Sequence, residues 1–552
     1  MEPSNTAPPL SRTDAMTALL HWGLVVAVIV SLGSGLRIAG DAQGAHLPAP
    51  LAGVLMQGNV IAWHIWSSVG VTFVAVAYVV YVTHAGLTAR IAVDAARLRA
   101  LAAADGRIRW PAANVVGHWL AFPLVAGMAV SGTLLYLDRP LLPHAVVAGL
   151  HRMMAWGFVA YAAMHVGLQL AIGGPRHLLQ MVAARPAHGR AARVAMLIGG
   201  ATVALLYVLD DAAIRKLAIA KVEPADTPVV DGYFDDAAWA RTRAVTIHTA
   251  HDGQPGGDLA VTVRALHDGQ YAYFSFEWPD ATRSQKHSPL LKTDDGWIVV
   301  GGDGDKENAY HEDKFAVMLA RAARAGGGTS HLGPKPLAGA AGSPSGRGLH
   351  FTSDGSVVDL WQWQSVRTNP VGMVSDGYIG PPTLNTEAAS DGGPAYVTGY
   401  ALDPRTGGGA TANYRRLDGD RVQPLYLPRT PFLTARLGRI DLAPDASDTG
   451  EWWLAKAETV PYSDTLDAQY PAGTVLPSVV IDGPLQGDRG DVRGVGRWHD
   501  GRWRLETVRR LHTGSEFDLP IVSGIYLWVA AFDHAQTRHS RHLHPLRLEL
   551  AE

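Results

Sequence analysis

The sequence predicts an α + β multidomain protein, in which a transmembrane four-helix bundle and a fifth membrane span precede an antiparallel β-sandwich. Two observations predict it. Long apolar runs fill the chain up to about residue 220, and beyond that point short alternating runs, Gly/Pro turns and most of the tryptophans take over. A chain of 552 residues is also too long for one ordinary hydrophobic core, so several domains are expected.

The composition narrows the chemistry that the chain can support. Its formal net charge of −3 gives no indication of nucleic-acid binding. The chain has no cysteine, which excludes disulfides, zinc–thiolate sites, iron–sulfur clusters and covalently attached c-type heme. Histidine and methionine are the soft metal ligands that remain.

Five apolar stretches in the first half are expected to cross a membrane. Four of them reach the roughly 20 residues that about 30 Å of hydrocarbon requires. The last is shorter and ends at two aspartates, so it is either a membrane span or an interfacial helix. The stretches are roughly Ala15–Arg37, Val60–Thr83, Val115–Leu137, Leu150–Ile172 and Val194–Leu209.

Basic residues alternate between the connections of these spans. Arginines cluster between spans two and three and again after span four, whereas residues 38–59 contain no Lys or Arg and residues 138–149 contain only Arg139. By the positive-inside rule the arginine-rich connections are cytoplasmic. We therefore expect a bacterial inner-membrane protein with a cytoplasmic amino terminus, an uncleaved first span and a periplasmic β half.

Four histidines lie within the spans and can be placed by depth. His151 and His165 are fourteen residues apart, which is about 21 Å along a helix and only some 40° around it, so both face the same side of the bundle. His64 begins the inward-running second span at the outer side, and His21 lies early in the outward-running first span. Depth therefore pairs His64 with His151 and His21 with His165.

Low-spin heme iron takes two histidines that face each other at equal depth as its axial ligands. The two pairs therefore predict two stacked hemes b. A single intramembrane histidine can instead satisfy a carbonyl or a neighbour, but four that match in pairs favour ligation. His118, in span three, has no depth partner left. It is expected near the inner heme or a quinone, with plain structural hydrogen bonding as an equal alternative.

Four segments, "LLHWGL", "AWHIWSSVG", "GHWLAFPLVAGMAVSG" and "HRMMAWGFVAYAAMH", resemble the bacterial cytochrome b561 family over roughly residues 10–185. The resemblance implies four heme-bearing spans, two b hemes and electron exchange with quinones. Carried over residue by residue, the iron ligands are His21, His64, His151 and His165.

Arg37 and Arg152 lie at the outer ends of their spans, where the outer heme's propionates are expected to emerge. A guanidinium pairs bidentately with a carboxylate, so we expect these arginines to bind the propionates. Interfacial snorkelling is the alternative.

The second half is predicted to form antiparallel strands. "LAVTVRAL" and "YAYFSFEW" flank the turn "HDGQ", and "GVGRW" and "RWRLETV" flank "HDG", so each pair predicts a hairpin. "GIYLWVAAFD" and "PLRLEL" supply closing strands. Few stretches show helical periodicity, which favours a β-sandwich.

The segment "PVVDGYFDDAAWARTRAVTIHT" resembles the start of family-9 carbohydrate-binding modules and of the heme-binding subunit of ethylbenzene dehydrogenase. "YHEDKFAVML", "DGSVVDLWQWQSVRT" and "AFDHAQTRH" resemble the heme-binding group, so the resemblance covers roughly residues 223–552. It implies one heme b, held by a methionine about ten residues before the Trp-x-Trp element and a lysine in the last hairpin.

The chain departs from that pattern at both positions. His350 stands near the methionine position, before Trp361 and Trp363, and His539 is the nearest match to the lysine, with His534, His542 and His544 close by. Imidazole ligates heme iron well, so His350 and His539 are the predicted ligands. His331 and Met373 are the reserve candidates, and solvated loop histidines are the alternative. The two tryptophans either pack on a heme face or belong to the core.

Together these patterns predict a di-heme transmembrane domain over residues 1–190, a fifth span and linker over 191–221, and a periplasmic heme-binding β-sandwich over 222–552. The expected function is electron transfer between the membrane quinone pool and a periplasmic electron-transfer protein. Two alternatives stay open. The β half could be a carbohydrate- or ligand-binding module, or the chain could be a superoxide:quinone oxidoreductase.

Overall fold

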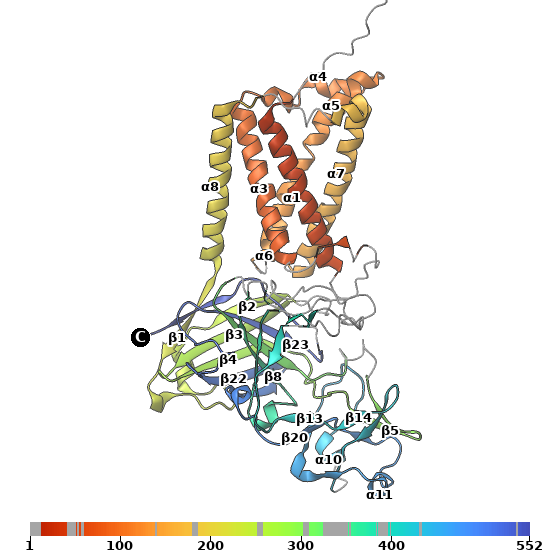
Figure 1. The fold of residues 1–552 in the computed structure, drawn as a ribbon, viewed down its shortest axis with the longest axis vertical. Helices are drawn as coiled ribbons and strands as arrows, with labels where there is room; N and C mark the ends of the chain where they lie inside the picture. Colours follow the sequence, from red (N-terminus) through yellow and green to blue (C-terminus); the bar gives the residue numbers. More distant parts are fainter. Residues whose placement is uncertain are drawn as a thin grey trace, which may run out of the picture. The chain divides into compact units, whose positions relative to one another are not determined.

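The computed structural model describes residues 13–40, 60–137, 141–178, 186–250, 258–301, 309–323, 355–381, 399–429, 433–536 and 539–552, with a few isolated positions between them. The chain divides into two compact units, a helical unit that ends at Ala213 and a β-rich unit that begins at Ile214. The predicted α + β class is confirmed (Figure 1).

The helical unit contains five helices long and apolar enough to span a membrane. Its third span consists of two helices that are interrupted at Trp119 and Leu120. The interruption has a local cause, because the ring of Pro123 clashes with a helical carbonyl four residues earlier. The helices are α1 (Ala15–Gly40), α3 (Val60–His84), α4 (Ala95–Ala100), α5 (Gly106–His118), α6 (Ala121–Tyr136), α7 (His144–Leu178, with a break at Gly173 and Gly174) and α8 (Gly189–Ala213).

The fifth helix, α8, packs against α3. Ala191, Ala195 and Gly199 recur every four residues, and an added Cβ at Gly199 would lie 2.7 Å from the ring of Phe73. Small residues at this spacing let two helix backbones approach closely. Helix α8 is attached to the bundle through α3. It is also longer than the predicted span Val194–Leu209.

The β-rich unit is built on one twelve-stranded sheet in the order β12-β9-β8-β7-β23-β24-β1-β3-β4-β22-β21, with β2 on β3. The strands are β1 (Arg215–Lys221), β2 (Val245–Ala250), β3 (Asp258–His267), β4 (Tyr271–Pro279), β7 (Lys314–Ala320), β8 (Val358–Gln364), β9 (Ser375–Ile379), β12 (Tyr400–Leu402), β21 (Arg493–His499), β22 (Arg502–Arg510), β23 (Tyr526–Phe532) and β24 (Leu546–Leu550).

Smaller sheets complete this unit. They contain β5 (Leu290–Thr293), β6 (Gly296–Val299), β10 (Thr383–Leu384), β11 (Tyr396–Val397), β13 (Ala410–Ala412), β14 (Tyr414–Arg416), β15 (Arg421–Pro424), β16 (Tyr426–Pro428), β17 (Leu454–Ala455), β18 (Thr459–Pro461), β19 (Val475–Leu476) and β20 (Val479–Ile481). The short helices α10 (Leu433–Leu437) and α11 (Asp464–Asp467) lie between them in sequence.

Both predicted hairpins form, as β3–β4 and β21–β22. In the second, Asp500 and Gly501 have φ of 51° and 71° between the paired residues His499 and Arg502. Two positive φ angles are what a two-residue type I′ turn requires, and Asp-Gly is a preferred pair for it.

The expected linker is shorter than predicted, because residues 215–221 form strand β1. This strand runs parallel to both β24 and β3, unlike the antiparallel pairs around it. Leu217 and Ile219 alternate inward and are fully buried, which explains why the segment is a strand.

The sheet curves so that the segment before β9, near one end of the sheet, bonds to the region of β21 at the other end, around a shared core. Val374, before β9, donates to the carbonyl of Val492, and Gly494 in β21 donates to that of Gly372, both at 3.0 Å. Trp361 and Trp363 of β8 pack in this core against Phe274, Trp278 and Trp503 from strands across the sheet. Of the two predicted roles for these tryptophans, the structure shows the core role.

Candidate functional site

The imidazole rings of His64 in α3 and His151 in α7 face each other with centroids 6.2 Å apart and planes at 76°. A metal–imidazole bond is about 2 Å long, and the bound nitrogen lies about 1 Å from its ring centre. Two imidazoles on opposite sides of one metal ion therefore have centroids about 6 Å apart. This spacing fits a bis-histidine iron site.

A serine hydroxyl fixes the tautomer of His151. Ser131 in α6 donates its single hydroxyl proton to the carbonyl of Gly127 at 2.7 Å, and its oxygen lies 2.9 Å from Nδ1 of His151. The oxygen therefore accepts a hydrogen bond from Nδ1. This leaves the lone pair of His151 on Nε2, the nitrogen available to a metal.

His64 has the same kind of support from α1. Ser34 donates to the carbonyl of Val30 at 2.6 Å, and Nδ1 of His64 lies 3.0 Å from the Ser34 hydroxyl and 3.1 Å from the carbonyl of Ser31. Both acceptors again place the proton on Nδ1 and the lone pair on Nε2.

A glycine follows each of these serines and leaves space for the imidazole. A Cβ added at Gly35 would lie 3.2 Å from Cε1 of His64, and one added at Gly132 would lie 3.3 Å from Cε1 of His151. Each histidine thus rests on a Ser-Gly pair of the neighbouring helix. These four supporting residues were not predicted, although the repeated Ser-Gly dipeptide near the outer end of spans one and three is a signal for them.

The second pair joins His21 in α1 to His165 in α7. Their ring centroids are 6.4 Å apart with planes at 45°, so this spacing also fits a bis-histidine site. Tyr161 stacks on His165 at 6.0 Å and 26°. The structure thus brings together all four histidines in the pairs that depth predicted, and iron ligation by them stays a prediction.

His118 lies next to this second pair. Its Nδ1 is 3.3 Å from the hydroxyl of Tyr161, and the rings of Tyr78 and Phe122 surround it at 6.2 and 5.7 Å. His118 thus contacts the Tyr161 hydroxyl, and the ring of Tyr161 stacks on His165. This arrangement can hold and move a proton beside the His21–His165 pair.

The two arginines at the outer span ends lie in different environments. Arg37 is in the last turn of α1 and is 1% exposed, whereas Arg152 follows His151 directly and is exposed. Arg37 lies three residues beyond Ser34, close in sequence to the His64 site. Propionate binding by either arginine stays a prediction.

Two of the histidines predicted for the β-rich unit, His350 and His331, lie outside the described residues. His539 is described, and its Nδ1 donates to the carbonyl of Ser540 at 2.8 Å while its ring packs on Phe532 at 4.9 Å. The Nδ1 proton leaves the lone pair on Nε2, as heme ligation requires.

The other candidates of this unit have structural contacts. Nε2 of His542 accepts from the amide of Val529, and its Nδ1 donates to the carbonyl of His544, so both nitrogens are used inside the protein. Nδ1 of His534 is bonded to the carboxylate of Asp533 at 2.6 Å. Met373 is buried and pairs with Arg493 of β21 in an isolated bridge.

An apolar cluster lies near His539 on strands β7, β8, β9 and β23. It is separate from the main core and includes Met318, Leu360 and Trp528, with Phe532 packed against it. Phe532 also contacts His539, so this buried apolar cluster is connected to a candidate ligand. Met318, whose thioether sulfur is a soft donor, lies in this cluster and was not predicted from the sequence.

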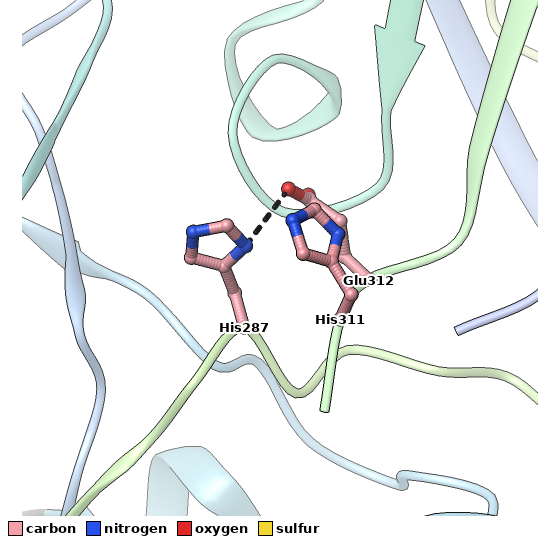
Figure 2. A group of neighbouring side chains, drawn as sticks. All are labelled: His287, His311 and Glu312. Carbon is pink, nitrogen blue, oxygen red and sulfur yellow. Dashed lines mark ion pairs between the residues drawn. The ribbon is translucent and has the colours of Figure 1, made fainter. Parts of the chain in front are cut away.

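His287, His311 and Glu312 form a further group (Figure 2). The two ring centroids are 4.4 Å apart, and Nδ1 of His287 lies 3.4 Å from Glu312. Burial, and then the nearby cations Arg367 and Lys314, lower the pKa of His287 to about 3 and that of His311 well below its usual value. Glu312 is occupied by Arg367 and the amides of residues 366 and 367, so the group anchors a loop and its positive surroundings oppose a bound cation.

Comparisons with known proteins agree with both resemblances. A family model described as ethylbenzene dehydrogenase matches residues 236–543, and one described as prokaryotic cytochrome b561 matches residues 12–184. No match to a curated protein was found.

Similar solved structures include a family-9 carbohydrate-binding module from Caldicellulosiruptor kristjanssonii in complex with glucose. It is 10% identical, with 61% of this chain and 97% of that chain covered and a TM-score of 0.22. A putative carbohydrate-binding protein from Bacteroides uniformis is 8% identical, with 61% and 100% covered and a TM-score of 0.25. TM-scores of this size carry no functional argument.

Proposed function

The chain belongs to the ethylbenzene dehydrogenase family, and from this premise we propose that it moves electrons between the membrane quinone pool and a periplasmic redox partner. The cytochrome b561 match and the five apolar helices support a membrane b-type cytochrome in electron transfer. We further propose that the chain holds three hemes, that it reacts with quinone, that it lies in the inner membrane and that its β-rich unit is periplasmic.

The observation that carries the proposal is the presence of two histidine pairs at heme-ligand spacing. His64 with His151 and His21 with His165 would each hold one heme b, which supplies the one-electron chemistry when bound. Ser34 and Ser131 hold two of the rings in one tautomer, so Nε2 is presented without a reorientation cost. Arg37 and Arg152 would bind propionates.

A quinone would react beside the His21–His165 pair. Oxidation of a quinol releases protons, and His118 with the Tyr161 hydroxyl is placed to accept one there. The family match supports quinone chemistry, and the His118–Tyr161 contact supports this end of the bundle.

The β-rich unit would hold a third heme b through His539 and His350. The buried apolar cluster around Met318 and Trp528 gives this part of the unit the apolar surroundings that a porphyrin needs, and Phe532 connects it to His539. The match of residues 236–543 to the ethylbenzene dehydrogenase family supports heme binding by this unit.

The number of hemes per chain tests the proposal. The full-length protein in detergent should contain three acid-extractable hemes, because the chain has no cysteine for covalent attachment. His539→Ala should lower the content to two or convert one heme from six- to five-coordinate, and His512→Ala, outside the His539 loop, is the matched control. Two hemes in the wild type, with a folded β-rich unit, would contradict the third site and favour a ligand-binding role for that unit.

A further inference from the structure

Four aspartates from separate segments meet inside the β-rich unit. Asp359 lies on β8, Asp376 on β9, Asp403 directly after β12 and Asp518 in the connection between β22 and β23. All four are buried, with exposures of 0, 0, 2 and 8%. Carboxylate oxygens of Asp359, Asp376 and Asp518 lie within 4.8 Å of one another. We call these four residues the Asp cluster.

Among the described residues, Arg509 contacts the Asp cluster directly, and Arg489 lies within electrostatic range of Asp403. Nη1 of Arg509 is bonded to Asp359 and lies 3.9 Å from Asp518, while its Nη2 donates to the carbonyl of Leu519. The guanidinium also lies over the ring of Trp361 at 5.0 Å, which fixes its position. Carboxylates thus outnumber guanidinium groups in this buried region, and burying such a charge excess is costly.

Most oxygens of the Asp cluster also have no hydrogen-bond donor among the described residues. The buried atoms without one are Oδ1 of Asp359, Oδ2 of Asp376, both carboxylate oxygens of Asp403 and both of Asp518. Buried polar atoms are nearly always paired, so six orphaned oxygens in one place indicate a missing partner. Burial, the neighbouring carboxylates and a hydrogen bond shared with Asp518 raise the pKa of Asp403 to about 7, so protons shared between carboxylates are the competing explanation.

We propose that the Asp cluster binds one Ca²⁺, which ties β8, β9 and the end of β12 to the β22–β23 connection. Ca²⁺ takes six to eight oxygen ligands at about 2.3–2.6 Å, so two oxygens on opposite sides of the ion are about 5 Å apart, as the cluster allows. Mg²⁺ holds several waters and needs near-octahedral geometry, which suits a dry set of carboxylates poorly. The Asp cluster differs in charge from the His287 group, where Arg367 and Lys314 oppose a cation.

Calcium binding by the full-length protein in detergent tests this site. After chelation and removal of the chelator, elemental analysis and calorimetry with CaCl₂ should give one tightly bound Ca²⁺ per chain and a raised melting temperature. Asp376→Asn and Asp518→Asn should each weaken binding by more than about tenfold, because ligand charge sets the affinity. Asp482→Asn, an exposed aspartate of the same unit, should bind as the wild type does.

Terbium luminescence gives a second readout on the unmodified protein, since Trp361 lies close enough to the Asp cluster to sensitise it. Ca²⁺ should displace Tb³⁺, and equal concentrations of Mg²⁺ should not. Absence of bound Ca²⁺ in the folded wild type would overturn the proposal in favour of shared protons. Equal displacement by Mg²⁺, or unchanged Ca²⁺ binding in both folded Asp variants, would also overturn it.

Discussion

The two histidine pairs have nearly equal ring spacing but different surroundings. Serine hydroxyls and glycines of neighbouring helices support His64 and His151, whereas Tyr161 stacks on His165 beside His118. A hydrogen bond from Nδ1 makes a histidine a stronger electron donor to its metal. A titratable pair beside the ring offers a route for protons instead. We infer from this difference that the first pair is adjusted for electron transfer and the second for proton-coupled quinone chemistry.

Removal of an axial ligand should have the strongest consequence. His151→Ala should abolish the heme of the His64 pair and leave that of the His21 pair, while His165→Ala should do the reverse, because each iron loses one of two axial bonds. Heme content and low-temperature spectra check this. His84→Ala, an exposed histidine at the end of α3, should retain both membrane hemes. Loss of both hemes in each folded single variant would show that the pairs are not independent.

An intermediate effect is expected at His118. In His118→Ala, a quinol analogue should reduce the membrane hemes roughly 100-fold more slowly, since a positioned general base contributes about 10²–10⁴-fold. Stopped-flow absorbance measures the rate. Tyr161→Phe should slow it less, as the tyrosine ring remains. Unchanged kinetics in a His118→Ala protein with intact hemes would remove the assigned difference between the two pairs.

The weakest effect should come from the serine hydroxyls. Ser131→Ala removes one acceptor of His151 Nδ1, leaving the backbone of Met128, and weakens donation to ferric iron, so the midpoint potential of that heme should rise. A tenfold change in preference between oxidation states corresponds to about 59 mV for one electron. Redox titration should show a shift of this order for one heme only. Ser68→Ala, whose hydroxyl bonds only the backbone of His64, is the control, and an equal shift there would contradict the role of Ser131.

The helical pairs could be predicted because helix geometry is regular. Fourteen residues fix both depth and direction along one helix, so the sequence alone placed His151 and His165 opposite His64 and His21. Their serine and glycine supports were not predicted, because Ser34 and Ser131 acquire their role only through contact with another helix.

The β-rich unit was less predictable, for a physical reason. Strand residues contact partners that are far apart in sequence, and loop lengths between them are not fixed by any repeat. Hairpins such as β3–β4 follow from local turns, but the parallel strand β1, the use of both nitrogens of His542 and the Asp cluster depend on distant segments.

The proposed function requires the two histidine pairs to form one electron path between the quinone and the β-rich unit. Rapid reduction by a quinol analogue, followed heme by heme in the wild type and in His151→Ala, tests this requirement. We predict that the variant still reduces the His21–His165 heme at the wild-type rate, while reduction of the heme in the β-rich unit slows by orders of magnitude. Reduction of that last heme at the wild-type rate in a variant lacking the His64–His151 heme would contradict the proposed path.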